Sequence, residues 1–126
     1  MDKKEYLTVD KISCYKRSFS LSNFVWDMVS RWQHFAKQTI GEQLVRAIDS
    51  ISANTAEGFG RYSKKDKVRF YRMAYASLIE AFDWNQKAFV RKLINKEQHG
   101  YILEELRELP RDINHLINFT NNKLKI

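Results

Sequence analysis

The sequence predicts an all-α protein, folded as an antiparallel up-down-up-down four-helix bundle. Only four glycines and one proline interrupt 126 residues, so long helices with short connections are expected. Hydrophobic residues make up 44% of the chain and recur with helical spacing in four successive stretches. Alternation typical of a strand is weak and confined to residues 6–12. A chain of this length is expected to form one domain around one core.

The chain is expected to begin with a tail over residues 1–12, where charged and apolar residues are mixed. Helical spacing starts at about Ser13 and predicts a first helix over residues 13–37. Hydrophobic side chains, Trp26 among them, lie most of the way round this helix. We therefore expect it to be buried on more than one side.

A second helix is predicted over residues 40–61. Thr39 and Glu42 have the spacing of a capping box, in which each side chain bonds the backbone N–H of the other residue. Gly60 suits the end of this helix, whereas Gly58 suits either an end or the close approach of a neighbouring helix.

A third helix is predicted over residues 64–94, with Ser63 and Asp66 as a weaker cap. It carries two apolar stripes about 140° apart. The stripe expected to face the core comprises Val68, Tyr71, Tyr75, Leu78, Phe82, Phe89 and Leu93. The second stripe comprises Phe70, Met73, Ser77, Ala81, Trp84 and Ala88. One core needs only one stripe, so the second is predicted to face another subunit.

The last helix is predicted over residues 97–122. Asn95 and Gln98 have the spacing of a cap at its start. Pro110 lies inside this helix, removes one backbone donor and crowds the preceding turn. We therefore expect a kink or a short break near Pro110.

The net charge of +7 is carried by residues 61–96, because the rest of the chain balances. A localised basic region is typical of proteins that bind nucleic acid or an acidic protein, although a solvated Lys-rich helix gives the same pattern. The candidate nucleic-acid-binding residues are Arg61, Lys64, Lys65, Arg69 and Arg72 at one end of the third helix, and Lys87, Arg91 and Lys92 further along.

No catalytic, metal or cofactor site is predicted. His34, His99 and His115 lack the spacing of helical metal ligands. Cys14 lies near two cations that would lower its thiol pKa, but no base accompanies it. The four glycines form no phosphate-binding loop. We therefore expect a protein that is not an enzyme.

The chain is expected to be cytoplasmic and to have no membrane partner. A single cysteine is usual for that compartment. No signal peptide is visible, and no apolar stretch approaches the ~20 residues of a membrane span.

One polar stripe of the second helix has an unusual composition, with little lysine and several short or hydrogen-bonding side chains. It comprises Gln43, Arg46, Ser50, Asn54, Glu57 and Arg61. Such a face suits contact with another protein surface. Together with Glu80, four of these residues (Arg46, Asn54, Glu57 and Arg61) are predicted to form a buried or subunit-facing network that specifies assembly. An acid–base role for Glu57 and Glu80 is the less favoured alternative.

From about Ile12 to Leu124 the chain resembles the four-helix-bundle proteins encoded in intervening sequences of bacterial 23S ribosomal RNA genes. The matching stretches are residues 43–47, 50–51, 54–61, 63 and 76–80. The family hallmark is Asn-Ile-Ala-Glu-Gly with Arg three residues later, followed downstream by Gly-Ser-Leu-x-Glu. Here Thr55 replaces the isoleucine and Ala76 replaces the first glycine of the second motif.

The resemblance implies a bundle that assembles into a ring, usually a pentamer, with no established enzymatic activity. The architecture is also similar to the accessory bundle proteins of diversity-generating retroelements, basic pentamers that bind nucleic acid and a reverse transcriptase. The functional expectation is thus a homo-oligomer that binds RNA, DNA or a nucleic-acid-processing partner such as a reverse transcriptase. The alternative is a scaffold or adaptor that binds protein only.

Overall fold

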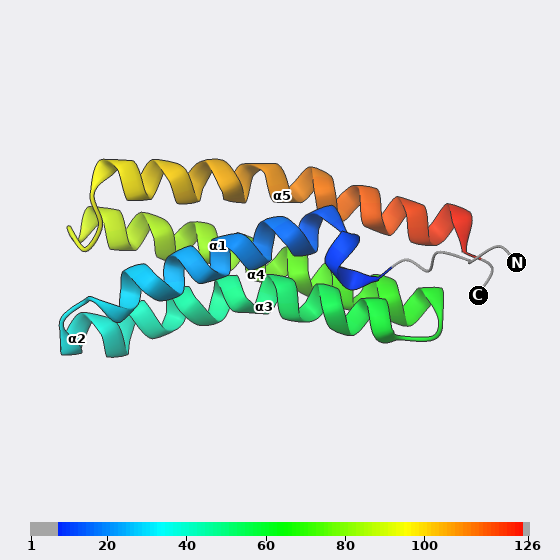
Figure 1. Cartoon of the computed structure of the whole chain (residues 1–126), viewed down its shortest axis with the longest axis horizontal. Helices are drawn as coiled ribbons and strands as arrows, with labels where there is room; N and C mark the ends of the chain where they lie inside the picture. Colours follow the sequence, from blue (N-terminus) through cyan, green and yellow to red (C-terminus); the bar gives the residue numbers. More distant parts are fainter. Residues whose placement is uncertain (1–7, 125–126) are drawn as a thin grey trace, which may run out of the picture.

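A computed structural model of the chain describes residues 8–124; residues 1–7, most of the predicted N-terminal tail, and residues 125–126 lie outside it. Four long helices lie side by side with alternating direction (Figure 1), and they are α1 (Ser13–Ser30), α3 (Glu42–Gly60), α4 (Lys64–Val90) and α5 (Lys96–Lys123). A short 3-10 helix, η1 (Val9–Lys11), precedes them. No strand occurs within residues 8–124. The predicted all-α four-helix bundle is confirmed.

The first helix ends earlier than predicted, at Ser30 instead of Lys37. After a short turn the chain becomes helical again in α2 (His34–Ala36) and continues without interruption through a π-helical turn, η2 (Lys37–Gly41), into α3. The connection between α1 and α3 is therefore itself mostly helical, and α3 has no free start near Ile40.

The predicted capping box at Thr39 is wrong for the same reason. The Thr39 hydroxyl donates to the Phe35 carbonyl at 2.7 Å, as a serine or threonine inside a helix commonly does. The N–H groups at the start of α3 are already bonded within the preceding turns, so no side-chain cap is needed.

The other two predicted caps are present. The Ser63 hydroxyl accepts the Asp66 N–H at 3.2 Å and begins α4. The Asn95 side chain accepts the Gln98 N–H at 2.7 Å, while the Gln98 side chain accepts the Asn95 N–H at 3.0 Å. Both α4 and α5 consequently start within a residue of their predicted positions.

α4 ends at Val90, four residues before its predicted end. Lys92 has a left-handed backbone with a φ of 64°. Its N–H donates to the Phe89 carbonyl at 3.0 Å, and the Leu93 N–H donates to the Ala88 carbonyl at 2.9 Å. These two bonds form a Schellman motif, which stops the helix at a position that usually holds glycine.

Pro110 does not break the last helix, since α5 is continuous from Lys96 to Lys123. The α5 ribbon bends in its orange half (Figure 1), where Pro110 lies. A proline leaves the carbonyl one turn earlier without its partner, and a bend of this kind accommodates it.

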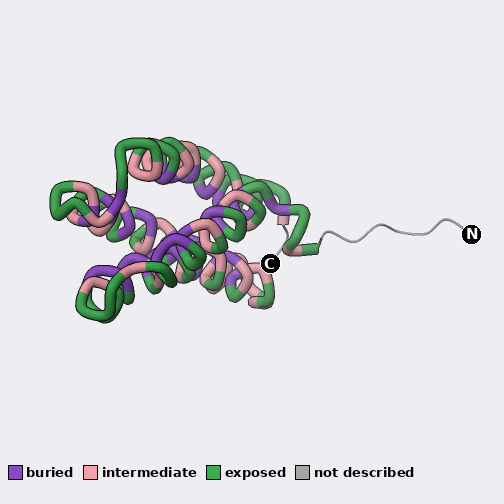
Figure 2. Tube along the Cα trace, turned by 60° about the vertical axis from the view of Figure 1, so that its left-hand side comes forward, coloured by how far each residue is buried: buried purple, intermediate pink, exposed green. Residues whose placement is uncertain are grey.

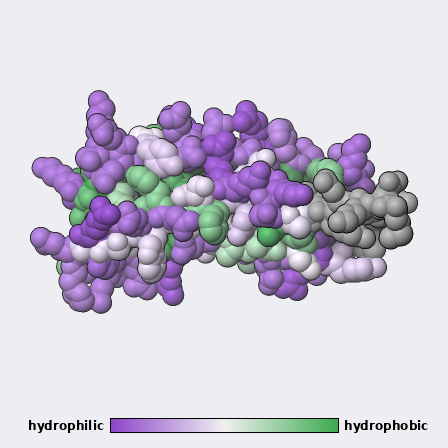
Figure 3. All heavy atoms as spheres, in the orientation of Figure 1, coloured by the Kyte–Doolittle hydropathy of each residue, from purple (hydrophilic) through white to green (hydrophobic). Residues whose placement is uncertain are grey.

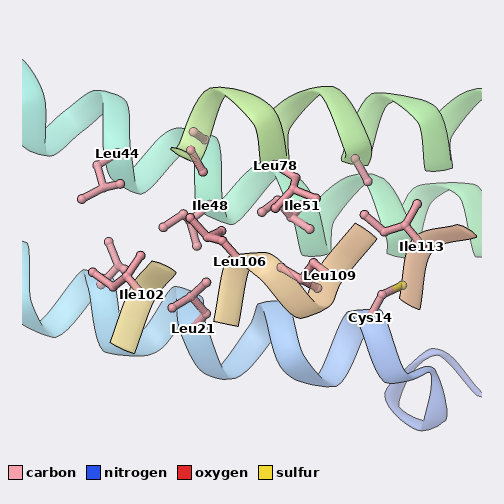
Figure 4. Packing of buried hydrophobic residues seen from close by; sticks show 14 of the residues in the cluster. Cys14, Leu21, Leu44, Ile48, Ile51, Leu78, Ile102, Leu106, Leu109 and Ile113 are labelled. Atoms are coloured by element: carbon pink, nitrogen blue, oxygen red, sulfur yellow. The ribbon is translucent and has the colours of Figure 1, made fainter. Parts of the chain in front are cut away.

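The core runs the length of the bundle, and all four long helices contribute to it (Figure 4). Its fully enclosed members include Leu21 from α1, Leu44, Ile48 and Ile51 from α3, Leu78 from α4, and Ile102, Leu106, Leu109 and Ile113 from α5. The burial pattern in Figure 2 follows the helical period, with one side of each helix buried. The buried residues of α3 recur at helical spacing on one face, as the hydrophobic spacing of the sequence predicts.

The two stripes predicted on α4 do not separate core from subunit contact. The buried residues of α4 come from both stripes and from positions between them, and they are Phe70, Tyr71, Ala74, Leu78, Ala81, Asn85 and Ala88. Three members of the supposed subunit-facing stripe (Phe70, Ala81 and Ala88) are therefore in the protomer's own interior. α4 packs against both α3 and α5, which requires a broad buried face, and its alanines let those helices approach closely.

Candidate nucleic-acid interface

Five predicted cations gather where α3 turns into α4, and we refer to them as the α3–α4 cluster. Its members are Arg61, Lys64, Lys65, Arg69 and Arg72. Lys65, Arg69 and Arg72 are exposed and follow one another at spacings of four and three residues. That spacing puts them on one face of α4. Asp66 is the only carboxylate between Arg61 and Arg72.

Two of these arginines are held by the same aromatic ring. The Arg61 guanidinium lies 4.4 Å from the centre of the Phe70 ring, and the Arg69 guanidinium lies 4.8 Å from it. Arg61 also pairs with Glu57 at 3.1 Å, whereas Arg69 is 3.5 Å from Asp66. The ring restricts both side chains while leaving part of each guanidinium exposed.

Two lysines of this end instead bind backbone carbonyls. Lys64 Nζ donates to the Asn121 carbonyl of α5 at 3.2 Å. Lys67, which was not among the predicted binding residues, donates to the Phe59 carbonyl at 2.6 Å. Burial lowers the pKa of Lys67. Lys67 therefore closes the C-terminal end of α3 and is a structural cation.

The remaining predicted cations form the α4–α5 cluster, composed of Lys87, Arg91 and Lys92. Lys87 Nζ pairs with Asp83 at 2.6 Å and lies 4.5 Å from the Trp84 ring. Arg91 and Lys92 are exposed in the turn that follows α4. Hydrophilic side chains crowd this end of the molecule, at the left of Figure 3. The structure thus places the eight predicted residues in two groups at opposite ends of α4, not on one continuous track.

Four exposed cations on α4 and its following turn have no acidic partner within the described part of the chain. Lys65, Arg72, Arg91 and Lys92 form no ion pair with any carboxylate of residues 8–124. Among the eight predicted binding residues, they are the exposed cations without an ion pair to the described residues.

The predicted assembly network is not one network in the protomer. Arg46 lies 3.7 Å from Glu42, and Asn54 donates to the Ser50 carbonyl at 2.9 Å. Glu80 accepts the indole N–H of Trp84 at 2.9 Å. Each of these contacts, like the Glu57–Arg61 pair, stays within one helix. The five residues are also partly or fully exposed, so the buried alternative does not hold within the protomer, and the subunit-facing alternative stays a prediction.

Two members of that set nevertheless face the same hollow. A polar groove of about 440 Å³ runs between α3 and α4, and both Arg46 and Glu80 line it together with small residues such as Ser50 and Ala53. The predicted assembly network had already grouped Arg46 with Glu80, although the two residues are far apart along the chain.

A second groove lies on the other side of α3, between it and α1. It measures about 400 Å³ and is lined by Trp26, Val29, Gly41, Val45 and Arg46 among others. Trp26 is 65% exposed, contrary to the expectation that the first helix is buried on more than one side. The α1–α3 groove is a largely apolar surface that the sequence analysis missed, because Trp26 has the helical spacing of a core residue.

Cys14 is not an activated thiol. It is 1% exposed, and its Sγ lies 3.9 Å from Thr55 Oγ1. Burial raises the pKa of Cys14 to about 11 and that of the neighbouring Tyr71 to about 12. Thr55, the residue that departs from the family hallmark, is thus part of a buried polar contact between α3 and α1.

An ion cluster joins α1 to α5 and was not predicted. Arg17 lies 3.2 Å from both Glu105 and Asp112. Burial alone would lower the pKa of Arg17, but the hydrogen bond to Asp112 and the charge of Glu105 raise it above its ordinary value. The two carboxylates are seven residues apart, two turns along one face of α5, and this spacing was the only available signal.

The histidines have local roles. His99 stacks on Phe89 with ring centres 4.2 Å apart, and its Nε2 is 3.3 Å from the Gln86 side-chain oxygen. Across residues 8–124, no three His, Cys, Asp or Glu side chains converge in a way that would hold a metal ion. Within the same residues no helix is both long and apolar enough to pass through a membrane.

The architecture has a counterpart among solved structures. A protein of unknown function from the S23 ribosomal protein family of Bacteroides thetaiotaomicron superposes with a TM-score of 0.73 at 18% sequence identity. The match covers 82% of this chain and 97% of that one. At this identity the similarity shows the fold alone. No curated protein matches the chain. The model of the 23S rRNA-intervening sequence protein family matches residues 10–115, and the chain therefore belongs to that family.

Proposed function

We propose that this protein is a non-enzymatic, cytoplasmic homo-oligomer that binds nucleic acid, in the first place structured RNA. The observation that carries the proposal is the set of four exposed cations, Lys65, Arg72, Arg91 and Lys92, that no carboxylate of residues 8–124 neutralises. Unpaired surface cations repel one another, and a phosphate backbone relieves that repulsion. The family name, which refers to ribosomal RNA genes, is consistent with an RNA ligand.

Assembly strengthens this proposal. A pentameric ring, as the family resemblance implies, would carry a charge of roughly +35 and would attract polyanions at long range. The polar stripe of α3, with Arg46, Asn54 and Glu57, is the surface that we assign to the contact between copies. A nucleic-acid-processing protein such as a reverse transcriptase would then be recruited through the shared nucleic acid or through a free face of the ring.

The test is salt-dependent binding of a fluorescent structured RNA. Affinity should fall as salt rises from about 50 to about 200 mM, with a logarithmic slope near −0.9 for each phosphate contacted. The variant Lys65→Gln/Arg72→Gln/Arg91→Gln/Lys92→Gln should lower affinity at least about tenfold at low salt and flatten the slope.

A control with the same change in net charge isolates position from total charge. Lys11, Lys16, Lys37 and Arg107 are also exposed and unpaired among residues 8–124. Replacing these four with glutamine should reduce binding much less than the first variant. Equal losses of affinity in both variants would show that only net charge matters. If the native protein shows no salt-dependent binding, the proposal is refuted.

The alternative is a scaffold that binds protein only, and the α1–α3 groove favours it. An exposed tryptophan beside an apolar hollow is typical of protein contact sites. Under this alternative the four glutamine substitutions leave function intact, whereas Trp26→Ala abolishes partner binding. Light scattering with and without total cellular RNA separates the two cases, since only the first gives an RNA-dependent rise in mass.

A further inference from the structure

We propose that the bound nucleic acid is a double helix of at least one turn, which lies along α4 and contacts both cation clusters of the same chain. This inference rests on the proposed nucleic-acid function and specifies its ligand. It follows from the distance between the clusters, the face that they share and the carboxylates between them.

Members of both clusters, among them Lys65, Arg69, Lys87 and Arg91, face the same side of α4. Arg69 and Arg91 are 22 residues apart, which is about 33 Å along a helix and about 40° around its axis. Lys65 and Lys87 have the same relation. A straight ligand lying parallel to α4 can therefore touch both clusters.

This distance matches the repeat of a duplex. Each backbone of a double helix returns to the same side once per turn, about every 34–36 Å in B-form DNA. Modules that bind double-stranded RNA similarly span about 16 base pairs and touch two successive grooves. Phosphates of one duplex thus reach the two ends of α4 together.

The middle of this face argues against a single strand. Glu80 and Asp83 are exposed between the clusters, and they are held there by Trp84 and Lys87. A single strand that ran along α4 would bring phosphates against these carboxylates, which repel them. A duplex docked with one of its grooves over Glu80 and Asp83 keeps its phosphates away from the acidic middle while its backbones reach both clusters.

Lys92 gives independent support to the cluster at the far end. Its φ of 64° is costly for any residue with a side chain, and glycine would adopt it freely. The protein is less stable with lysine than with glycine at this position. A functional role for the charge of Lys92 would explain why lysine is present there.

The experiment measures the affinity of the protein for RNA duplexes of about 6 to about 20 base pairs. A single strand with the longest sequence and a matching series of DNA duplexes are measured alongside. The native oligomer is used throughout. Affinity should rise at least about tenfold between about 6 and about 14 base pairs and then level off. Arg69→Gln/Arg72→Gln and Arg91→Gln/Lys92→Gln should each remove this rise, whereas Lys11→Gln/Lys16→Gln should keep it.

Lys92→Gly supplies a second measurement that does not depend on folding defects. It should raise the urea midpoint while weakening the binding of the 14-base-pair duplex at least about threefold, with little effect on the 6-base-pair duplex. A length threshold in RNA, in DNA or in both supports the proposal.

Three results would overturn it and leave the proposed function standing. These are a single strand that binds as tightly as the duplex, no gain beyond about 6 base pairs, or a threshold above about 20 base pairs, which would indicate bridging between copies. The absence of any nucleic-acid binding would instead refute the proposed function itself.

Discussion

Gly58 marks the closest approach between α3 and α4. A Cβ at this position would lie 2.7 Å from the Tyr71 ring and 3.0 Å from the Lys67 carbonyl. Tyr71 is itself buried, so its ring has little room to move. Gly58 therefore serves the close packing of α3 against α4, which resolves the alternative that the sequence left open for this residue.

Gly58→Ala should destabilise the fold by about 1–3 kcal/mol, because either the ring or the helix must shift. Urea denaturation measures the change. Gly60→Ala is the matched control, since nothing lies within 4 Å of its added methyl group, and it should stabilise the helix by about 0.5–1 kcal/mol. A loss of similar size in both variants would contradict the packing explanation.

Cys14 makes stability sensitive to alkaline pH. Burial raises its pKa from 9.0 to about 11, so the unfolded thiol ionises first as pH rises. Between these values the unfolded chain binds fewer protons than the folded one, and the free energy of unfolding falls as pH increases. The loss is on the order of 2 kcal/mol by pH 11. Tyr71 adds a similar loss at higher pH, since its pKa is also raised.

Urea denaturation at several values between pH 8 and pH 10 tests this expectation. Cys14→Ala should be less stable than the native protein at pH 8 but should lose less stability up to pH 10. Parallel curves for the two proteins would show that Cys14 does not titrate as described.

At the scale of elements, the contact between α1 and α5 depends on Arg17. Its two carboxylate partners are partly buried, and the Asp112 side chain is only 11% exposed. Removing the cation leaves that carboxylate with poor solvation and without its partner. This contact links the first and last helices, which the chain does not connect directly.

Arg17→Ala should therefore lower the free energy of unfolding by about 1–3 kcal/mol. This is less than the loss expected for a fully buried ion pair, because Arg17 is itself partly exposed. Thermal unfolding measures the change. Arg31→Ala, which removes a pair whose two side chains are 76% and 68% exposed, should cost less than about 0.5 kcal/mol. Equal effects would mean that the α1–α5 cluster contributes no more than a surface pair.

Helix starts were predictable where a short polar side chain caps them. Ser63 and Asn95 bond their own helix within three residues, so the information is local. The start of α3 was not predictable in this way, because Ile40 and Gly41 are buried against the rest of the bundle and keep the preceding turn helical. Packing at that corner overrides the apparent cap at Thr39.

For the whole molecule, the exposed polar stripe of α3 bears on assembly. Asn54 and Glu57 bond only within α3, and the Glu57 side chain is 54% exposed. Their loss should leave the protomer folded. Asn54→Ala/Glu57→Ala should thus keep native helicity and change the free energy of unfolding of the protomer by no more than about 0.5 kcal/mol per site.

If this stripe contacts another copy, the same variant should shift light scattering towards smaller particles, because a subunit contact loses two polar partners. Ser52→Ala on a neighbouring turn of α3 is the control, since its hydroxyl bonds only the Asp49 carbonyl. If the variant keeps the native particle size, the stripe is not part of the subunit contact, and the α1–α3 groove becomes the candidate surface.

The sequence by itself determined the fold class, the core of α3, two of the caps and the family. These follow from helical spacing and local hydrogen bonding, which depend on residues that are close together in the sequence. Only the tertiary structure decided that the buried face of α4 draws on both predicted stripes, that Trp26 is exposed and that Cys14 is buried. Each of these depends on which helix lies opposite, and residues as distant as Arg17 and Asp112 meet only when the bundle closes.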